Sequence, residues 1–173
     1  MNILGHFKTI TKHRHAVIYH SYKVGILWRG LLHDLSKYTP TEFWKGARYY
    51  KDGRRSPNEA EREDCGYSAA WIHHKGRNFH HFEYWTDYNP KTKTIEPIEM
   101  PIVFVKEMFC DRVAASKIYQ KESYSDSHPL EYFIRGKATR VIHPATSDLL
   151  ESWLQMLNDK GEEETFKYIK SIK

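Results

Sequence analysis

Apolar residues near the start of the chain recur at the spacing of a helix face. Ile10, Val17 and Val24 stand at seven-residue intervals, and Gly25 follows them directly. Residues seven apart lie on one side of an α-helix, and glycine is common just beyond a helix end. A second apolar segment occupies residues 26–38. The pattern therefore predicts a helix from residue 10 to residue 24, followed by a second apolar helix.

Two tetrapeptides carry the residue order of a helix start. In each, a hydroxyl residue at the N-cap is followed by proline at the first helical position and then, two residues later, by glutamate. The glutamate is expected to bond back to the N-cap backbone N–H, as in a capping box. The tetrapeptides are Thr39-Pro40-Thr41-Glu42 and Ser56-Pro57-Asn58-Glu59. The second is expected to open a long helix that reaches about His74.

The rest of the chain alternates polar turns with further helices. Periodicity fades between residues 76 and 97, where the stretch NPKTKTIEP predicts an exposed turn or a short hairpin. Gly161 is expected to separate the last two helices, because glycine commonly ends a helix. The helices predicted here are residues 100–119, a short one from Pro129, residues 144–160 and residues 162–173.

These elements indicate a helical protein with one core. The chain has 173 residues, enough to bury a core without disulfides, and shows neither an internal repeat nor a linker. We therefore expect an all-α, single-domain bundle that comprises residues 1–173. Its candidate site would lie within residues 10–120, and helices within residues 129–172 would complete it.

Composition and charge narrow the class of protein. The chain is 40% hydrophobic and 28% charged, as in ordinary soluble proteins. Its two cysteines, Cys65 and Cys110, match no metal or disulfide pattern, which predicts reduced thiols and a cytoplasmic protein. No apolar stretch approaches the roughly 20 residues of a membrane span, so no membrane association is expected. A net charge of +5 suits an anionic ligand, but scattered Lys and Arg residues argue against nucleic acid.

Histidine is the unusual component of this composition. Of the 11 histidines, seven fall into three tight groups. Histidine is the commonest metal ligand, so such grouping favours a metal site. The groups are His13/His15/His20, His73/His74 and His80/His81.

Helical geometry selects among the first group. His13 lies three residues after Ile10 and four before Val17, so it shares their buried stripe. His20 faces the same way, whereas His15 points to roughly the opposite side. A histidine on an apolar face is more often a satisfied core residue than a ligand, so a ligand role for His13 requires partners.

Two acidic residues could be those partners. Asp34 follows His33 at the end of an apolar segment, which sets an imidazole beside a carboxylate. Alone, this dipeptide is more often a locally bonded pair than a site. Asp111 falls on an otherwise apolar helical stripe, and an ionised carboxylate is rarely buried without a cation or several donors. A distant salt bridge would account for it equally well. The stripe comprises Phe104, Met108, Asp111, Ala115 and Ile118.

The segment HHKGRNFHH, residues 73–81, offers four more imidazoles. Two histidine pairs, His73/His74 and His80/His81, flank a short loop at the end of a predicted helix. An exposed polar turn is the plainer interpretation. The density of imidazoles at the junction of a helix and an irregular segment favours a set of metal ligands, and which member of each pair binds stays open.

Together these residues resemble the H…HD…D signature of the HD superfamily. The resemblance implies that His13, His33, Asp34 and Asp111 ligate a divalent metal, in an HD-like helical bundle. LLHDLSK is similar to the family's HD-x-[GS]-K turn, which implies that Lys37 faces a substrate phosphate. The extra histidines resemble the additional ligands of bimetal members such as the HD-GYP phosphodiesterases. These are His73, His74, His80 and His81.

A narrower resemblance covers residues 13–153. HDLSKYTPTEF, AWIHHKGRNFHHFEYW and MPIVFVKEMFCDRVAAS are similar to a bacterial and phage subfamily of HD-like proteins, which brings no established substrate. The chain departs from the HD-GYP proteins because it lacks the GYP motif and its histidine pairs are closer together. Hydrolysis of a cyclic dinucleotide is therefore not the expectation.

The function expected from these residues is metal-dependent phosphohydrolysis. Mixed His and carboxylate ligation suits one or two ions of Mn, Fe, Co, Ni or Zn. The substrate would be a small phosphoester such as a nucleotide, with Lys37 and Arg77 neutralising the phosphoryl oxygens. For Lys75 a solvated surface charge is the plainer role. Two alternatives stay open: a di-iron HD-type oxygenase, and a metal-stabilised binding or regulatory protein without catalysis. Sequence leaves the oligomeric state undetermined.

Overall fold

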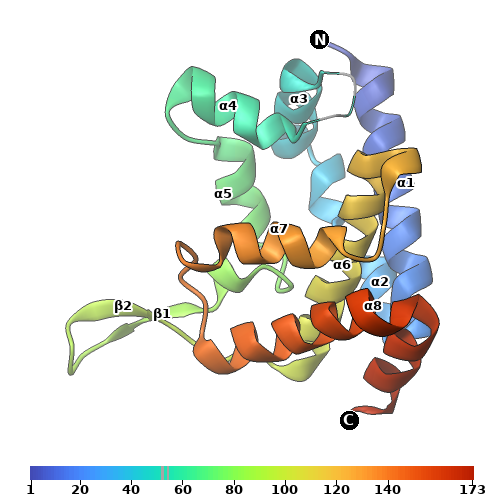
Figure 1. Cartoon of the computed structure of the whole chain (residues 1–173). Coiled ribbons are helices and arrows are strands. Elements are labelled where there is room, and N and C mark those ends of the chain that lie inside the picture. The colour runs from blue at the N-terminus through green and yellow to red at the C-terminus, as the bar shows by residue number, and fades with distance from the viewer. Residues whose placement is uncertain (52, 54) are drawn as a thin grey trace.

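The computed structural model describes residues 1–51, 53 and 55–173 and is mostly helical (Figure 1). The elements up to Lys75 are all helical. The α-helices are α1 (Ile3–Lys23), α2 (Leu27–Leu32), α3 (Pro40–Tyr49), α4 (Pro57–Cys65) and α5 (Ala69–Lys75), with a 3₁₀ turn η1 (Leu35–Tyr38) between α2 and α3.

The elements after Lys75 include a single small sheet within the described part. The 3₁₀ turn η2 (Phe82–Tyr84) leads into an antiparallel hairpin that projects from the body, as Figure 1 shows. The predicted short hairpin is thus confirmed. The remaining elements are β1 (Thr86–Asn89), β2 (Thr94–Pro97), α6 (Ile102–Gln120), η3 (Lys121–Ser123), α7 (His128–Lys137) and α8 (Pro144–Ser171).

The core lies where α1, α6, α7 and α8 meet. One hydrophobic cluster joins side chains from all four helices, and α1 runs beside both α6 and α8. Helix α3 packs on the N-terminal part of α1, and α4 and α5 pack on α3 (Figure 1). The fully buried members of the cluster include Val17, Val113, Phe133, Leu154 and Ile169.

Helix α1 is longer than predicted. It begins at Ile3 rather than at residue 10, because the Asn2 side chain accepts a hydrogen bond from the Gly5 N–H and caps its first turn. The stripe read from the sequence is confirmed, since Ile10, His13 and Val17 are buried. The predicted break at Gly161 is also confirmed. There the backbone of α8 adopts φ 76° and ψ 178°, which separates two helical stretches.

Two details of the predicted helices were wrong. The helix expected to run to His74 ends at Cys65, because Gly66 takes a left-handed φ of 78° and Ser68 then caps α5 by accepting from the Trp71 N–H. Neither predicted capping box forms: the Thr39 hydroxyl donates to the Ser36 carbonyl, and the Glu59 carboxylate accepts from Arg55. The Glu42 carboxylate turns inward and contacts His73 and His74.

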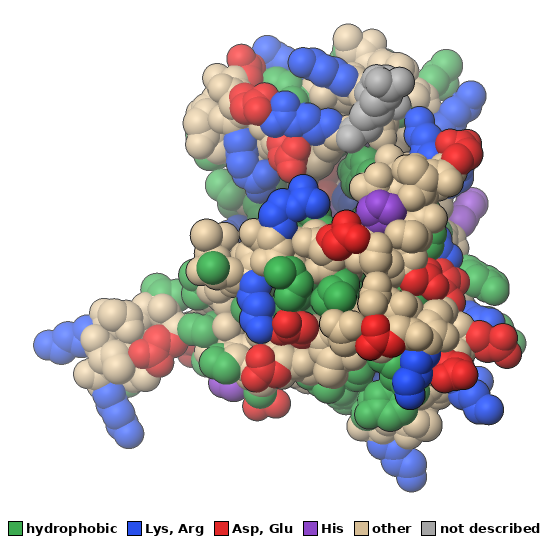
Figure 2. Space-filling view, in the orientation of Figure 1, with side chains coloured by type: hydrophobic (Ala, Val, Ile, Leu, Met, Phe, Trp, Pro, Cys, Tyr) green, Lys and Arg blue, Asp and Glu red, His purple; other side chains and the backbone are tan. Residues whose placement is uncertain are grey.

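The described surface has mixed charge and no membrane-spanning helix. Lys and Arg side chains are interspersed with Asp and Glu over the face drawn in Figure 2. Among the described residues, none of the helices has both the length and the apolar composition that crossing a membrane requires.

Candidate metal centre

A strained turn presents the His33-Asp34 pair to the interior. Helix α2 ends at Leu32, His33 is extended, and Asp34 adopts φ 55° and ψ 23°, a left-handed conformation that is uncommon for a residue other than glycine. Arg14 of α1 holds this turn, because its guanidinium donates to the carbonyl oxygens of Leu31 and His33. The result is a His33 and an Asp34 that are only 1% and 2% exposed.

The first group of side chains joins α1, this turn and α6. His13 Nε2 lies 2.9 Å from Asp111 Oδ1 and 3.8 Å from Asp34 Oδ2. His33 Nε2 lies 3.3 Å from the same oxygen of Asp34 and 3.5 Å from Asp111 Oδ1. The four side chains therefore direct one ligand-type atom each toward a common point, within 4.8 Å of one another.

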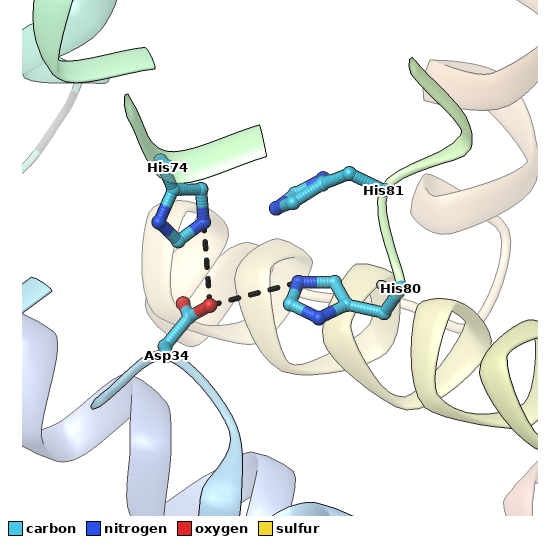
Figure 3. Close-up of side chains that lie close together, drawn as sticks. All are labelled: Asp34, His74, His80 and His81. Carbon is cyan, nitrogen blue, oxygen red and sulfur yellow. Dashed lines mark ion pairs between the residues drawn. The ribbon is translucent and has the colours of Figure 1, made fainter. Parts of the chain in front are cut away.

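The second group lies on the other side of the same carboxylate (Figure 3). Asp34 Oδ1 is 3.3 Å from His74 Nε2 and 3.6 Å from His80 Nε2. His74 comes from α5, and His80 and His81 come from the loop that follows. The four ligand-type atoms of Asp34, His74, His80 and His81 again lie within 4.8 Å of one another. Asp34 is thus shared, with one oxygen facing each group.

Several of these atoms are buried without a hydrogen bond from the described residues. They include the Nε2 atoms of His33, His80 and His81 and the Oδ1 atom of Asp34. Buried polar atoms almost always have a hydrogen-bonding partner, and here they converge in two clusters of nitrogen and oxygen donors. The donor set is chemically suited to a divalent transition metal in each cluster.

Sequence reasoning missed two glutamates that support the histidines. Glu107 of α6 is fully buried, and its Oε1 lies 3.0 Å from His33 Nδ1 and 3.3 Å from His80 Nδ1. Arg29 Nε donates to its other oxygen at 2.9 Å. Glu107 therefore touches one histidine of each group. Its position four residues before Asp111 places both acids on one helix face, a signal that could have found it.

Glu42 supports the histidines of α5 in the same way. Its Oε2 lies 2.8 Å from His74 Nδ1, and its Oε1 lies 2.6 Å from His73 Nδ1. Asn78 adds to this set, because its amide donates to the Ser36 hydroxyl and to the His74 carbonyl. The inward turn of Glu42 thus orients the His74 ring, with Nδ1 toward Glu42 and Nε2 toward Asp34.

The electrostatics keep the acids charged. Burial raises the pKa of Asp34, but His33 and Lys37 outweigh it and hold that pKa well below its usual value. Burial likewise opposes ionisation of Glu107, yet His33 and His80 lower its pKa to about 2. Asp111 follows the same balance, with His13 lowering its pKa against burial. All three are carboxylates at neutral pH.

The histidines divide into two classes. Burial lowers the pKa of His13, His80 and His81, which favours the neutral imidazole that a metal requires. Burial acts in the same direction on His33 and His74, but the neighbouring Asp34 carboxylate raises both pKa values. The same carboxylate that lies between the two groups thus raises the pKa of one histidine in each.

The remaining predicted site residues lie around the two groups. Lys37 Nζ is 2.6 Å from Asp34 Oδ2, with 29% of the side chain exposed. His73 contacts Glu42 and belongs to neither group. Arg77 is exposed, and its guanidinium donates to the His73 carbonyl. His15, which the helical wheel excluded as a ligand, is exposed on α1.

A cavity of about 80 Å³ adjoins the second group. Lys37, Glu42 and His74 form part of its lining, so it borders the candidate centre directly. Arg77 is not among the described residues that line it. Thr9 and Tyr50 contribute hydroxyl groups to the lining. The other lining residues come from α1, α3, α4, α5, the segment that precedes α4, and Tyr119 of α6.

Comparison with known proteins adds a family but no activity. Neither the curated proteins nor the solved structures include one that matches the chain. A family model described as "Family of unknown function (DUF5662)" matches residues 2–156, a stretch that contains every residue of the candidate centre. The chain therefore belongs to the DUF5662 family.

Proposed function

We propose that this protein is a metal-dependent phosphohydrolase whose two ion sites share Asp34. The observation that carries the proposal is the position of the Asp34 carboxylate, with one oxygen toward His13 and His33 and the other toward His74 and His80. A carboxylate between two sets of imidazoles is the arrangement that two neighbouring cations need. The fold would then be an HD-like bundle.

The ligands would divide between the two ions. His13, His33, Asp34 and Asp111 would hold one, and Asp34, His74, His80 and His81 the other. This mixture of imidazole and carboxylate favours Mn, Fe, Co, Ni or Zn over Ca or Mg. When bound, such ions would supply Lewis-acid chemistry, which activates water as a nucleophile and neutralises phosphoryl oxygens.

The two glutamates prepare the rings for this role. Glu107 is ionised, so it accepts a hydrogen bond from Nδ1–H of His33 and leaves Nε2 of that ring to ligate. Glu42 accepts from Nδ1–H of His74 in the same way. The tautomers of both rings are thereby held with their free nitrogen toward Asp34.

Lys37 is the cation placed to bind the substrate. Partial burial opposes its charge, but Asp34 and Asp111 raise its pKa, so it is an ammonium at neutral pH. It borders both Asp34 and the cavity. A phosphoryl group at the centre would accept a hydrogen bond from Lys37 Nζ, which would stabilise the charge that develops on its oxygens.

The proposal is tested by a screen of phosphomonoesters, nucleotides and cyclic dinucleotides with each of the five metals. Lys37→Ala is expected to retain its metal and lose about 10²–10³ in turnover, whereas Asp34→Ala loses metal and activity together. Lys45→Ala is the matched control, because Lys45 also pairs with a buried carboxylate, Glu61, outside the centre. It should behave as wild type.

Two outcomes would contradict the proposal. A metal-loaded protein that is silent on the whole panel but consumes oxygen with two bound irons would be an oxygenase. One that is silent on every substrate and holds its metal irreversibly would be a binding or regulatory protein. Equal losses in Lys37→Ala and Lys45→Ala would remove the assigned role of Lys37.

A further inference from the structure

The cavity beside the candidate centre has a charged inner wall. Lys37 and His74 line it, and both contact Asp34, at 2.6 Å from Nζ to Oδ2 and 3.3 Å from Nε2 to Oδ1. A group bound to Lys37 beside Asp34 would therefore lie at the edge of this space. Arg55 also lines the cavity, but its guanidinium is engaged by Glu59 and Glu63.

Apart from Arg55, the rest of the wall offers uncharged polar groups beside apolar side chains. The Thr9 and Tyr50 hydroxyls are joined at 2.8 Å, and Asn58 adds an amide. His6 completes this wall, and burial together with Lys37 lowers its pKa to about 4, which leaves it neutral at pH 7. Such groups offer hydrogen bonds to hydroxyl or carbonyl oxygens and no compensation for a second charge.

The cavity is small, which favours a small bound group. Pockets for drug-sized ligands measure roughly 300–1,000 Å³, and this cavity measures about 80 Å³. That space holds only a few non-hydrogen atoms and is far smaller than a nucleoside. The apolar part of the wall includes Ala70, which is 4% exposed, so a larger residue there would fill the remaining space.

We infer that the cavity formed by Thr9, Tyr50, Asn58 and Ala70 binds the organic group of the substrate, which is a short hydroxylated phosphomonoester rather than a nucleotide. This inference rests on the proposed phosphohydrolase function. The phosphate would lie against Lys37, and a chain of two to four carbon atoms with its hydroxyl groups would face Thr9 and Tyr50. It replaces the nucleotide expected from sequence with a smaller substrate.

The test is calorimetric binding to protein loaded with a metal that supports no turnover, with metal content and melting temperature recorded for each variant. Glycerol 3-phosphate, AMP and inorganic phosphate are the probes. Glycerol 3-phosphate is expected to bind at least 10-fold more tightly than AMP. Ala70→Leu should weaken the binding of glycerol 3-phosphate by 10-fold or more. It should leave the metal content and the binding of inorganic phosphate unchanged, because inorganic phosphate has no organic group.

A second, milder pair of variants tests the inference if Ala70→Leu does not fold. Thr9→Val removes the cavity hydroxyl and should weaken glycerol 3-phosphate by about 2- to 10-fold, the loss of one neutral hydrogen bond. Thr11→Val is the matched control, because Thr11 also bonds a tyrosine, Tyr38, at 3.1 Å, and does not line the cavity. It should leave the binding of all three probes unchanged.

The possible failures are distinguishable. Inorganic phosphate that binds, together with AMP as tight as glycerol 3-phosphate, overturns the inference and leaves the proposed function standing. The same holds if Thr9→Val and Thr11→Val have equal effects, or if Ala70→Leu weakens all three probes alike. A wild-type protein that binds neither metal nor phosphate overturns the proposed function, and the inference falls with it.

Discussion

Glu107 shows how a single buried acid can serve both halves of the candidate centre. It contacts His33 of the first group and His80 of the second, and Arg29 binds its other oxygen. A carboxylate behind a metal-binding histidine fixes the tautomer and the ring orientation. In the proposed centre Glu107 is therefore a positioning residue that contacts no substrate and acts through the two rings.

Glu107→Gln is expected to weaken metal binding by about 10- to 100-fold. The amide keeps the shape but exchanges a charged acceptor for a neutral one, so the Nδ1–H of His33 is held less firmly and His80 loses a neighbouring negative charge. Metal titration against a competing chelator measures the effect. Glu61→Gln is the matched control, because Glu61 is also a buried acid, 2% exposed, and bonds Lys45 and Ser68 rather than a histidine. Equal affinities in the two variants would contradict the role assigned to Glu107.

The sequence indicated the candidate metal ligands but not the two glutamates, Glu42 and Glu107, that contact their histidine rings. His13 and Asp111 stood out because each is a polar residue on an apolar helical stripe. Glu42 was predicted to cap a helix, since the capping-box pattern is local and the two histidines that bind it are more than 30 positions away. The choice between His73 and His74 also needed the structure, because adjacent helical residues differ by about 100° in direction.

Among the secondary-structure elements, the short helix α2 depends on a side chain from another helix that bonds to its C-terminal end. It has six residues, and its end passes directly into the strained Asp34. Arg14 of α1 binds the carbonyl oxygens of Leu31 and His33 there, which supplies partners for groups that a helix end leaves free. The geometry of the His33-Asp34 pair thus depends on an arginine from another helix.

Arg14→Met should therefore destabilise the protein by about 1–2 kcal/mol, because it removes charged donors from two carbonyl groups. For a chain of this length, each kcal/mol lowers the melting temperature by roughly 2–4 °C. Lys12→Met on the same helix is the control, since Lys12 is exposed. Thermal unfolding of both variants without metal measures the difference, and identical melting temperatures would show that the turn holds without Arg14.

Helix existence was predictable, and helix boundaries less so. The apolar stripe was sufficient to predict helix α1, and Gly161 to predict the break in α8, because periodicity and glycine are local signals. The break between α4 and α5 was missed although Gly66 lies there, because the apolar and polar pattern continues through it. The sequence identified the His33-Asp34 pair but not its backbone conformation, since the left-handed turn at Asp34 is held by contacts with α1.

At the scale of the molecule, the candidate ligands tie together parts that are distant in sequence. They come from α1, the turn after α2, α5, the loop after it and α6. An ion that binds only the folded chain stabilises it by mass action. The expectation that residues 1–173 form one domain stays a prediction, but a centre shared by these elements would couple α3–α5 to the core of α1 and α6.

A chelator should therefore lower the melting temperature of the wild-type protein. Removing an ion present at 100 times its dissociation constant costs about 2.7 kcal/mol of stability, which corresponds to several degrees for a chain of this length. Asp34→Ala should show no such shift, because it removes the residue common to both groups. A chelator shift of equal size in both proteins would mean that the metal binds elsewhere.

The most direct measurement is elemental analysis of protein purified without chelator or added metal. We predict two transition-metal ions per chain, one for each group that shares Asp34. Asp34→Ala should lose both, and His15→Ala, on the exposed side of α1, should retain both. A wild-type protein that is metal-free and cannot be reconstituted with Mn, Fe, Co, Ni or Zn would contradict the central claim.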